Sequence, residues 1–143
     1  MDFEHSPKDF EGYIATASRA YVDITRKFVQ NVEYWNEISP KYLGGQVTFK
    51  LDGSRAIGSA IGKKFSISIS LLVIETQTFG LAVLSAPQVL SGEYVEIDRF
   101  LISTKGSVHS VDRALLLGWE EDYQSYRLLV AIVRKVLNHS PSA

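Results

Sequence analysis

Two carboxylates in one short segment are the residues of this chain best placed to do chemistry. The segment EYVEIDRF occupies residues 93–100, and its alternation predicts a strand with Tyr94, Glu96, Asp98 and Phe100 on one face. Carboxylates at i and i+2 of a strand lie about 6.5–7 Å apart at their Cα atoms. That spacing suits acid–base chemistry or a shared divalent cation. It is also typical of the solvent-facing side of an antiparallel strand, which is the interpretation we favour.

A histidine could complete such a site. Of the three histidines, only His109 falls inside predicted secondary structure. A three-residue turn before it pairs His109 with Leu101, whereas a two-residue turn pairs it with Ile102. Only one of these registers places His109 on the face of the two carboxylates. The chain also has no cysteine, which excludes a thiolate nucleophile and a Cys-ligated metal. We therefore predict no catalytic residue, no metal site and no cofactor.

The most regular alternation lies in FSISISLLVIET, residues 65–76, where large apolar residues alternate with Ser66, Ser68 and Ser70. Small hydroxyls between large apolar residues predict a strand buried on one side only. Leu72 then interrupts the serine side, so this end of the strand is apolar on both faces. We expect a sheet that curls around a helix or buries its apolar end in a dimer.

A long helix must precede these strands. Ser6 and Pro7 predict its N-cap and first residue, and apolar residues follow at helical spacing to Ser39–Pro40, where we expect the helix to stop. About 30 residues of helix span roughly 45 Å, more than the width of a small domain. We therefore expect a bend, or one end that reaches out to a partner. The predicted apolar stripe is Phe10, Ile14, Ala17, Tyr21, Ile24, Phe28, Val32, Trp35 and Ile38.

After Gly44–Gly45 the apolar period changes from 3.6 to 2, which predicts an antiparallel meander of five to six strands. A second helix is predicted from near Asp112, with Gly118 separating a short first piece from the main one. The expected strands cover 46–52, 55–61, 65–75, 79–85, 93–103 and 107–111. The expected buried stripe of the second helix is Trp119, Tyr123, Tyr126, Val130, Val133 and Leu137.

Length and composition predict a single α+β domain over residues 1–143, with residues 1–5 and 140–143 as disordered tails. The hydrophobic fraction of 45% is enough for a real core, and the net charge of −1 provides no field that would attract nucleic acid or anionic lipid. No run of about 18 apolar residues is present, which excludes a membrane-spanning helix. The acidic N-terminus is not a secretory signal, and we expect a cytoplasmic protein.

These features predict a small, non-catalytic protein-interaction module, such as an adaptor, a chaperone-like protein or an immunity-type binder, that self-associates as a homodimer. The first alternative is a small-molecule-binding protein or enzyme, with a pocket between the long helix and a curved sheet that uses Glu96 and Asp98. A weaker alternative is single-stranded nucleic-acid binding through basic residues of the sheet beside Phe49. The predicted partner-binding residues are Trp35, Ser66, Ser68, Ser70, Tyr94, Glu96, Asp98, Arg99 and Trp119.

Overall fold

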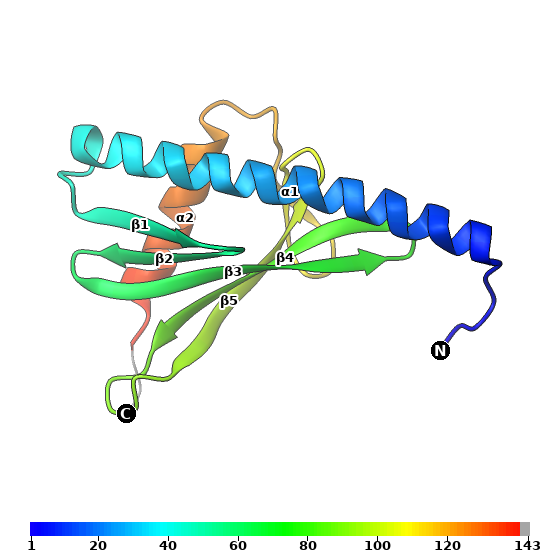
Figure 1. The fold of residues 1–143 in the computed structure, drawn as a ribbon. Coiled ribbons are helices and arrows are strands. Elements are labelled where there is room, and N and C mark those ends of the chain that lie inside the picture. Colours follow the sequence, from blue (N-terminus) through cyan, green and yellow to red (C-terminus); the bar gives the residue numbers. More distant parts are fainter. Residues whose placement is uncertain (141–143) are drawn as a thin grey trace.

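A computed structural model describes residues 1–140 and shows two helices and one seven-stranded antiparallel sheet (Figure 1). Helix α1 covers Pro7–Tyr42 and helix α2 covers Gln124–Asn138. Each strand pairs with the next along the chain, so the sheet is a simple meander. This confirms the predicted α+β arrangement, although with one strand more than expected. The strands are β1 Val47–Asp52, β2 Arg55–Ala60, β3 Lys63–Ile74, β4 Gln77–Pro87, β5 Tyr94–Ser103, β6 Val108–His109 and β7 Leu115–Leu117.

The first helix begins where the sequence predicts. The Ser6 hydroxyl accepts a hydrogen bond from the backbone N–H of Asp9 at 3.1 Å, and Pro7 is the first helical residue. Residues 1–5 precede it without secondary structure, whereas the predicted tail at 140–143 lies, except for Ser140, outside the described residues.

The first helix ends later than predicted, because it continues through Pro40 to Tyr42. A proline lacks the N–H of one helical hydrogen bond and usually kinks or ends a helix beyond its first turn. The buried Ser39 hydroxyl donates to the carbonyl of Val47 and accepts from its N–H, so the end of the helix is tied to β1. The helix is continuous from its first residue to its last.

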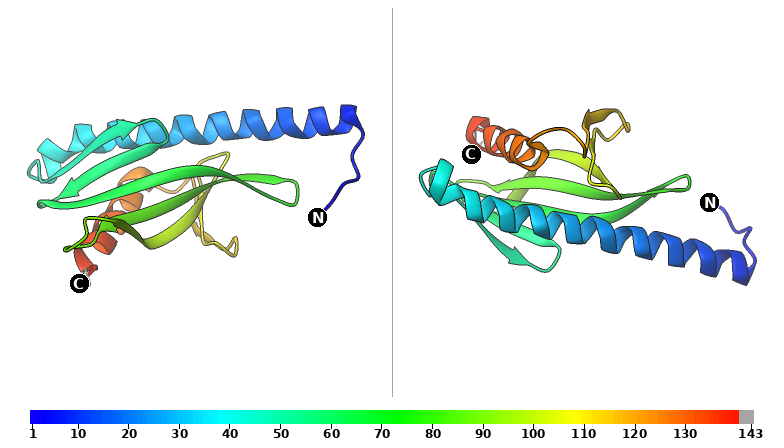
Figure 2. Two further views of the ribbon diagram at one scale, coloured as in Figure 1. Left: turned by 60° about the horizontal axis from the view of Figure 1, so that its bottom comes forward. Right: turned by 90° about the horizontal axis from the view of Figure 1, so that it is seen from above.

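Both helices cover the same face of the sheet, and the other face is open (Figure 2). Helix α2 lies beside the C-terminal half of α1. The core between the helices and the sheet is closely packed around aromatic residues of α1, β1 and β3, with the Phe49 ring centred 5.2 Å from that of Trp35 and 5.5 Å from that of Phe65. The residues of this core include Ile24, Phe28, Val32, Trp35, Phe49, Phe65, Ile67, Leu84, Phe100, Leu129 and Ile132.

Two glycines allow this close packing. A Cβ atom added at Gly58 would lie 2.3 Å from Cζ of Phe65, and one added at Gly80 would lie 2.7 Å from Cγ2 of Ile24. Gly58 therefore leaves room for the Phe65 ring, and Gly80 lets α1 approach β4. Glycine within a strand commonly marks such a close approach.

Helix α1 also closes the first edge of the sheet. The side chain of Asn36 accepts from the backbone N–H of Phe49 at 2.8 Å and donates to its carbonyl at 2.9 Å. Ser39 makes the equivalent pair of bonds to Val47. Two side chains thus take the place of a neighbouring strand, which protects β1 from edge-to-edge pairing.

The C-terminal part differs from the prediction. Residues Leu115–Leu117 form β7, and α2 begins only at Gln124, so no helix starts near Asp112. The predicted stripe is also wrong, because the buried residues of α2 are Leu128, Leu129, Ile132 and Val136. The run LLVAIV offers an apolar residue at nearly every position, so periodicity could not select the face that meets the sheet.

Candidate functional site

A bulge in β5 separates the two carboxylates that the sequence placed together. Asp98 pairs with Leu84 and Glu96 pairs with Ser85, so Ile97 is an extra residue with no partner in β4. One inserted residue reverses the alternation of faces beyond it. Tyr94 and Glu96 therefore project from the open face, whereas Asp98 and Phe100 project toward the helices. The prediction that all four share a face is wrong.

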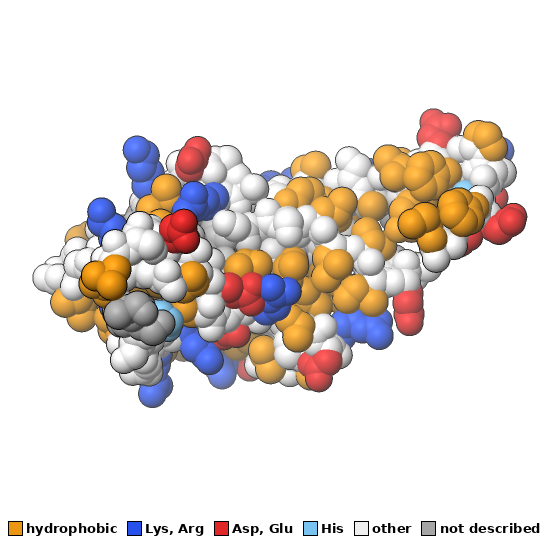
Figure 3. Space-filling model, turned by 90° about the horizontal axis from the view of Figure 1, so that it is seen from below, with side chains coloured by type: hydrophobic (Ala, Val, Ile, Leu, Met, Phe, Trp, Pro, Cys, Tyr) orange, Lys and Arg blue, Asp and Glu red, His pale blue; other side chains and the backbone are white. Residues whose placement is uncertain are grey.

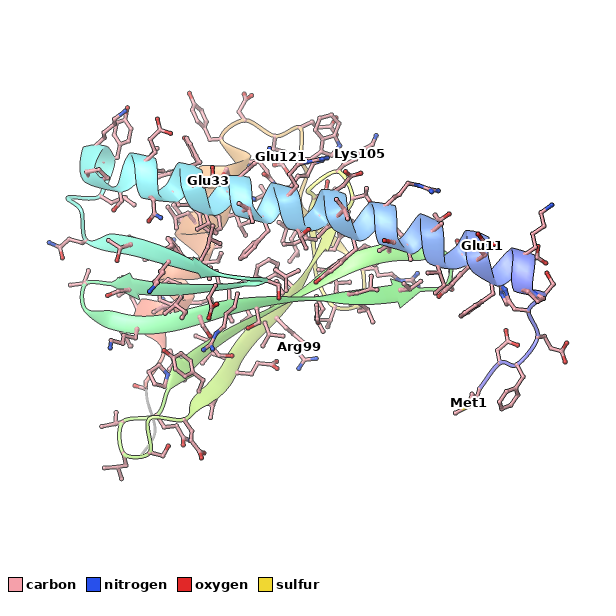
Figure 4. The ribbon with its side chains drawn as sticks, in the orientation of Figure 1. Met1, Glu11, Glu33, Arg99, Lys105 and Glu121 are labelled. Carbon is pink, nitrogen blue, oxygen red and sulfur yellow. The ribbon has the colours of Figure 1, made fainter. Side chains whose placement is uncertain are left out.

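The same bulge creates an ion pair on the open face. Residues at i and i+3 of a regular strand lie on opposite faces, but here Glu96 and Arg99 lie on the same one. The Arg99 guanidinium donates to both carboxylate oxygens of Glu96, with Nε 2.6 Å from Oε2. This hydrogen bonding lowers the pKa of Glu96 and raises the pKa of Arg99. Figure 4 shows Arg99 on the side of the sheet away from α1.

Asp98 has different partners on the helix side. One of its oxygens accepts from the backbone N–H of Arg99 at 2.8 Å, and the other lies 3.6 Å from Nζ of Lys135 on α2. Glu96 and Asp98 are thus held on opposite faces by separate cations, and they cannot share a proton or a metal ion.

The register of β6 also decides the place of His109, which pairs with Leu101 and so lies on the open face. Its ring packs edge-on against Phe79 at 5.8 Å between centroids, and its Nδ1 lies 3.3 Å from the carbonyl oxygen of Arg113. Asp98 is on the other face. Among residues 1–140 there is no group of three or more potential ligands arranged to hold a metal ion.

The serine side of β3 faces away from both helices. Ser68 and Ser70 are exposed to solvent, but Ser66 is buried. The Arg55 guanidinium of β2 stacks on the Tyr94 ring of β5 at 5.1 Å, so this contact crosses over β3 and β4, the two strands between them. Around these serines the open face is therefore polar and partly bridged by its own side chains, whereas Phe79 and Leu101 on the same face are buried.

The two tryptophans proposed as partner contacts have different environments. Trp35 is fully buried, and its indole Nε1 donates to the carbonyl of Ser125 at 2.9 Å, so it joins α1 to α2 and no partner can reach it. Trp119 is 49% exposed before α2, with Nζ of Lys105 5.5 Å from the ring. Only Trp119 is accessible to a partner.

An exposed apolar surface lies at one end of the molecule, where no partner-binding residue was predicted. We define the distal arm as residues 7–22 of α1 together with residues 70–80 at the end of the β3–β4 hairpin, which extend beyond the rest of the sheet (Figures 1 and 2). Phe10 and Ile14 belong to the apolar stripe of α1, yet they are 51% and 50% exposed, whereas Ile24 on the same stripe is fully buried.

Aromatic residues extend this apolar surface beyond the start of the helix. Phe10 stacks on Tyr13 at 6.0 Å between ring centroids, and His5 packs edge-on against both. Phe3 is almost fully exposed nearby in sequence, and Leu71 is half exposed on the hairpin. Figure 3 shows hydrophobic side chains gathered at this end of the molecule. The periodicity of the sequence placed Phe10 and Ile14 on the stripe but could not show that the sheet leaves them uncovered.

The total accessible surface is large for a chain of this mass. It measures 8950 Å², whereas a compact monomer of 16.0 kDa exposes about 7,400 Å². The excess over a compact shape is about 1,500 Å².

No protein-family model, curated protein or solved structure matches this chain. Neither helix in the described part of the chain has the length and apolar character needed to cross a membrane.

Proposed function

We propose that this protein is a non-catalytic protein-interaction module that binds through its distal arm, with a second copy of the same chain as the partner. The observation that carries the proposal is the exposed end of the α1 stripe. Phe10 and Ile14 keep the spacing of the buried residues that follow them, but the sheet does not cover them. Apolar residues that continue a buried stripe into solvent mark an interaction surface.

The accessible area supports a second copy as the partner. A stable dimer of standard size buries about 800 Å² on each chain. The excess accessible surface of this protein is larger than that area. Several side chains of the arm are large and aromatic, the type that contributes most to interface stability. Such a module could act as an adaptor, a chaperone-like protein or an immunity-type binder, and its lack of cysteine supports a cytoplasmic location.

The geometry favours this proposal over a pocket that uses the two carboxylates, because Glu96 and Asp98 lie on opposite faces and each is paired with a cation. Nucleic-acid binding by the sheet is also less favoured. Phe49 is buried against the helices rather than available for stacking, and Nζ of Lys63 is bound to the carbonyl of His139.

The test is the mass in solution, measured by light scattering over a dilution series. The wild-type chain should have twice the chain mass of 16.0 kDa at high concentration. Ile14→Glu places a charge in the centre of the proposed interface and should give the mass of a single chain at every concentration.

The matched control is Arg19→Glu, which changes the charge of the same helix more strongly but on its other face. This variant should dimerise as the wild type does. A wild-type chain that is monomeric throughout, or an Ile14→Glu variant with the mass of a dimer, would refute the proposal.

A further inference from the structure

The second edge of the sheet, unlike the first, is only partly closed. Strand β6 pairs with β5 at Leu101 and Ile102 alone. Beyond His109 the chain turns onto itself, since the N–H of Ser110 donates to the carbonyl of Ala114 at 2.9 Å. Within residues 1–140, the segment of β5 from Tyr94 to Phe100 therefore has a neighbouring strand on one side only.

A groove opens where β6 turns away from β5. It encloses about 540 Å³ and lies between β5, the β6–β7 region and α2. Its apolar lining includes Phe100, Leu116, Leu128, Ala131 and Ile132. This volume is within the range of about 300–1,000 Å³ that is typical of binding pockets.

The groove meets the backbone edge of β5 and not only its side chains. Three consecutive residues, Asp98, Arg99 and Phe100, line it, although alternate residues of a strand point to opposite faces. The N–H of Ser103 bonds to Ser107 on the β6 side of β5, and the N–H of Arg99, four residues earlier, faces the same side. It donates to the carboxylate of the neighbouring Asp98 at 2.8 Å. The Asp98 carboxylate thus occupies the position that a carbonyl of an added strand would take.

The charges at the groove favour an acidic occupant. Arg127 and Lys135 lie on α2 one turn before and one turn after Ala131, and both line the groove opposite the single carboxylate of Asp98. In the structure Arg127 pairs with Glu121 at 2.9 Å and Lys135 pairs with Asp98 at 3.6 Å. All four side chains are 41–61% exposed, so replacing either carboxylate by one from a bound segment costs little free energy.

We propose that this groove binds an extended acidic segment of another protein, which adds to the edge of β5 as a strand and places alternate apolar side chains against Leu128 and Ile132. Main-chain hydrogen bonds to a free sheet edge provide the affinity in this mode of recognition, and the groove provides the specificity. The site is separate from the distal arm and does not depend on self-association.

The experiment selects phage-displayed random nine-residue peptides on the wild-type protein and measures the binding of the enriched peptides by fluorescence anisotropy. The Ala131→Trp variant fills the groove from an exposed helical position, and it should bind them at least about tenfold more weakly. Asn138→Trp, at an exposed position of α2 outside the groove, is the matched control and should bind as the wild type does.

A second pair of variants tests the backbone contact. Arg99→Pro removes the outward N–H without removing a bond to β4, whereas Arg99→Ala keeps that N–H, and only the proline variant should lose peptide affinity. On binding, amide NMR signals of residues 98–100 should shift. If Ala131→Trp folds poorly, Leu116→Glu takes its place and obstructs the groove from the opposite wall.

Three results would overturn the proposal. The first is no enriched peptide, and the second is enriched peptides that bind the wild type and Ala131→Trp equally. The third is a change of oligomeric mass in Ala131→Trp, which would assign the groove to a second copy of this chain.

Discussion

The two halves of α1 carry one apolar stripe in two environments. Ile24, in the proximal part that follows the distal arm, is fully buried against the sheet, whereas Ile14 within the distal arm is 50% exposed. The residue type, the helix and the spacing are the same. The difference arises because the helix is 36 residues long, or roughly 54 Å, and most strands of the sheet are much shorter than that.

The comparison shows that an amphipathic pattern predicts which face of a helix packs against a partner. It does not indicate whether that partner belongs to the same chain. In the part of the chain that the structure describes, only the β3–β4 hairpin follows α1 outward, and there Val73 and Thr78 lie across a shallow groove from Gly12 and Tyr13. The proximal stripe is used within the protein, and we propose that the distal stripe is used between copies of it.

The largest expected contrast is between the two isoleucines. Ile24→Ala should lower the free energy of unfolding by about 2–5 kcal/mol, because it leaves a cavity in the core. Ile14→Ala should lower it by less than about 1 kcal/mol in the monomer. Urea unfolding followed by circular dichroism, at a concentration where the chain is monomeric, measures both. Equal losses would mean that the distal arm is packed within its own chain.

Substitutions of two glycines by alanine test the same comparison through smaller expected changes in stability. Gly80→Ala should destabilise the fold by about 1–3 kcal/mol, because the new methyl group would overlap Ile24. Gly12→Ala lies on the distal half of α1, where nothing is within 4 Å of the added atom, and it should stabilise the helix by up to about 1 kcal/mol. Thermal unfolding of both variants should show shifts of opposite sign. A stabilising Gly80→Ala would contradict the close approach of α1 to β4.

The smallest expected effect is a pH dependence that involves neither half of α1. The pKa of Glu96 is lowered in the folded protein by the hydrogen bonds from Arg99, so this pair stabilises the fold above the pKa of the unfolded chain. Its contribution should disappear as the pH falls through the lowered pKa. An NMR titration of the Glu96 carboxyl group in the wild type and in Arg99→Ala measures the shift.

In Arg99→Ala the pKa of Glu96 should return toward its ordinary value. An unchanged pKa would mean that Arg99 is not its partner in solution. Acidification should also leave the contrast between Ile14→Ala and Ile24→Ala intact, because neither isoleucine contacts the pair.

Much of the fold was predictable because its signals are local. The N-cap at Ser6 and the turn between the expected strands 46–52 and 55–61 depend on residues within a few positions of one another, and the structure confirms both. The continuation of α1 through Pro40 was not predictable, because it depends on the distant contact between Ser39 and Val47. The start of α2 was misplaced because ALLLG is as compatible with a short strand as with a helix.

The candidate sites were less predictable than the fold. The alternation from Tyr94 to Phe100 continues without interruption in the sequence, yet the bulge at Ile97 reverses it. The bulge depends on how β5 pairs with β4, and no residue type within β5 predicts it. The burial of Trp35 similarly depends on α2, whose Ser125 is far away in the sequence.

The sequence by itself determined the local elements: the amphipathic first helix and its cap, the meander of short antiparallel strands, and the absence of thiol chemistry. These follow from spacing, side-chain type and composition, which act over a few residues. Only the tertiary structure decided which apolar residues are covered, which sheet edge is closed, and which charged groups meet. Those outcomes depend on the relative lengths of packed elements and on the pairing of distant strands, and neither quantity is present in a local pattern.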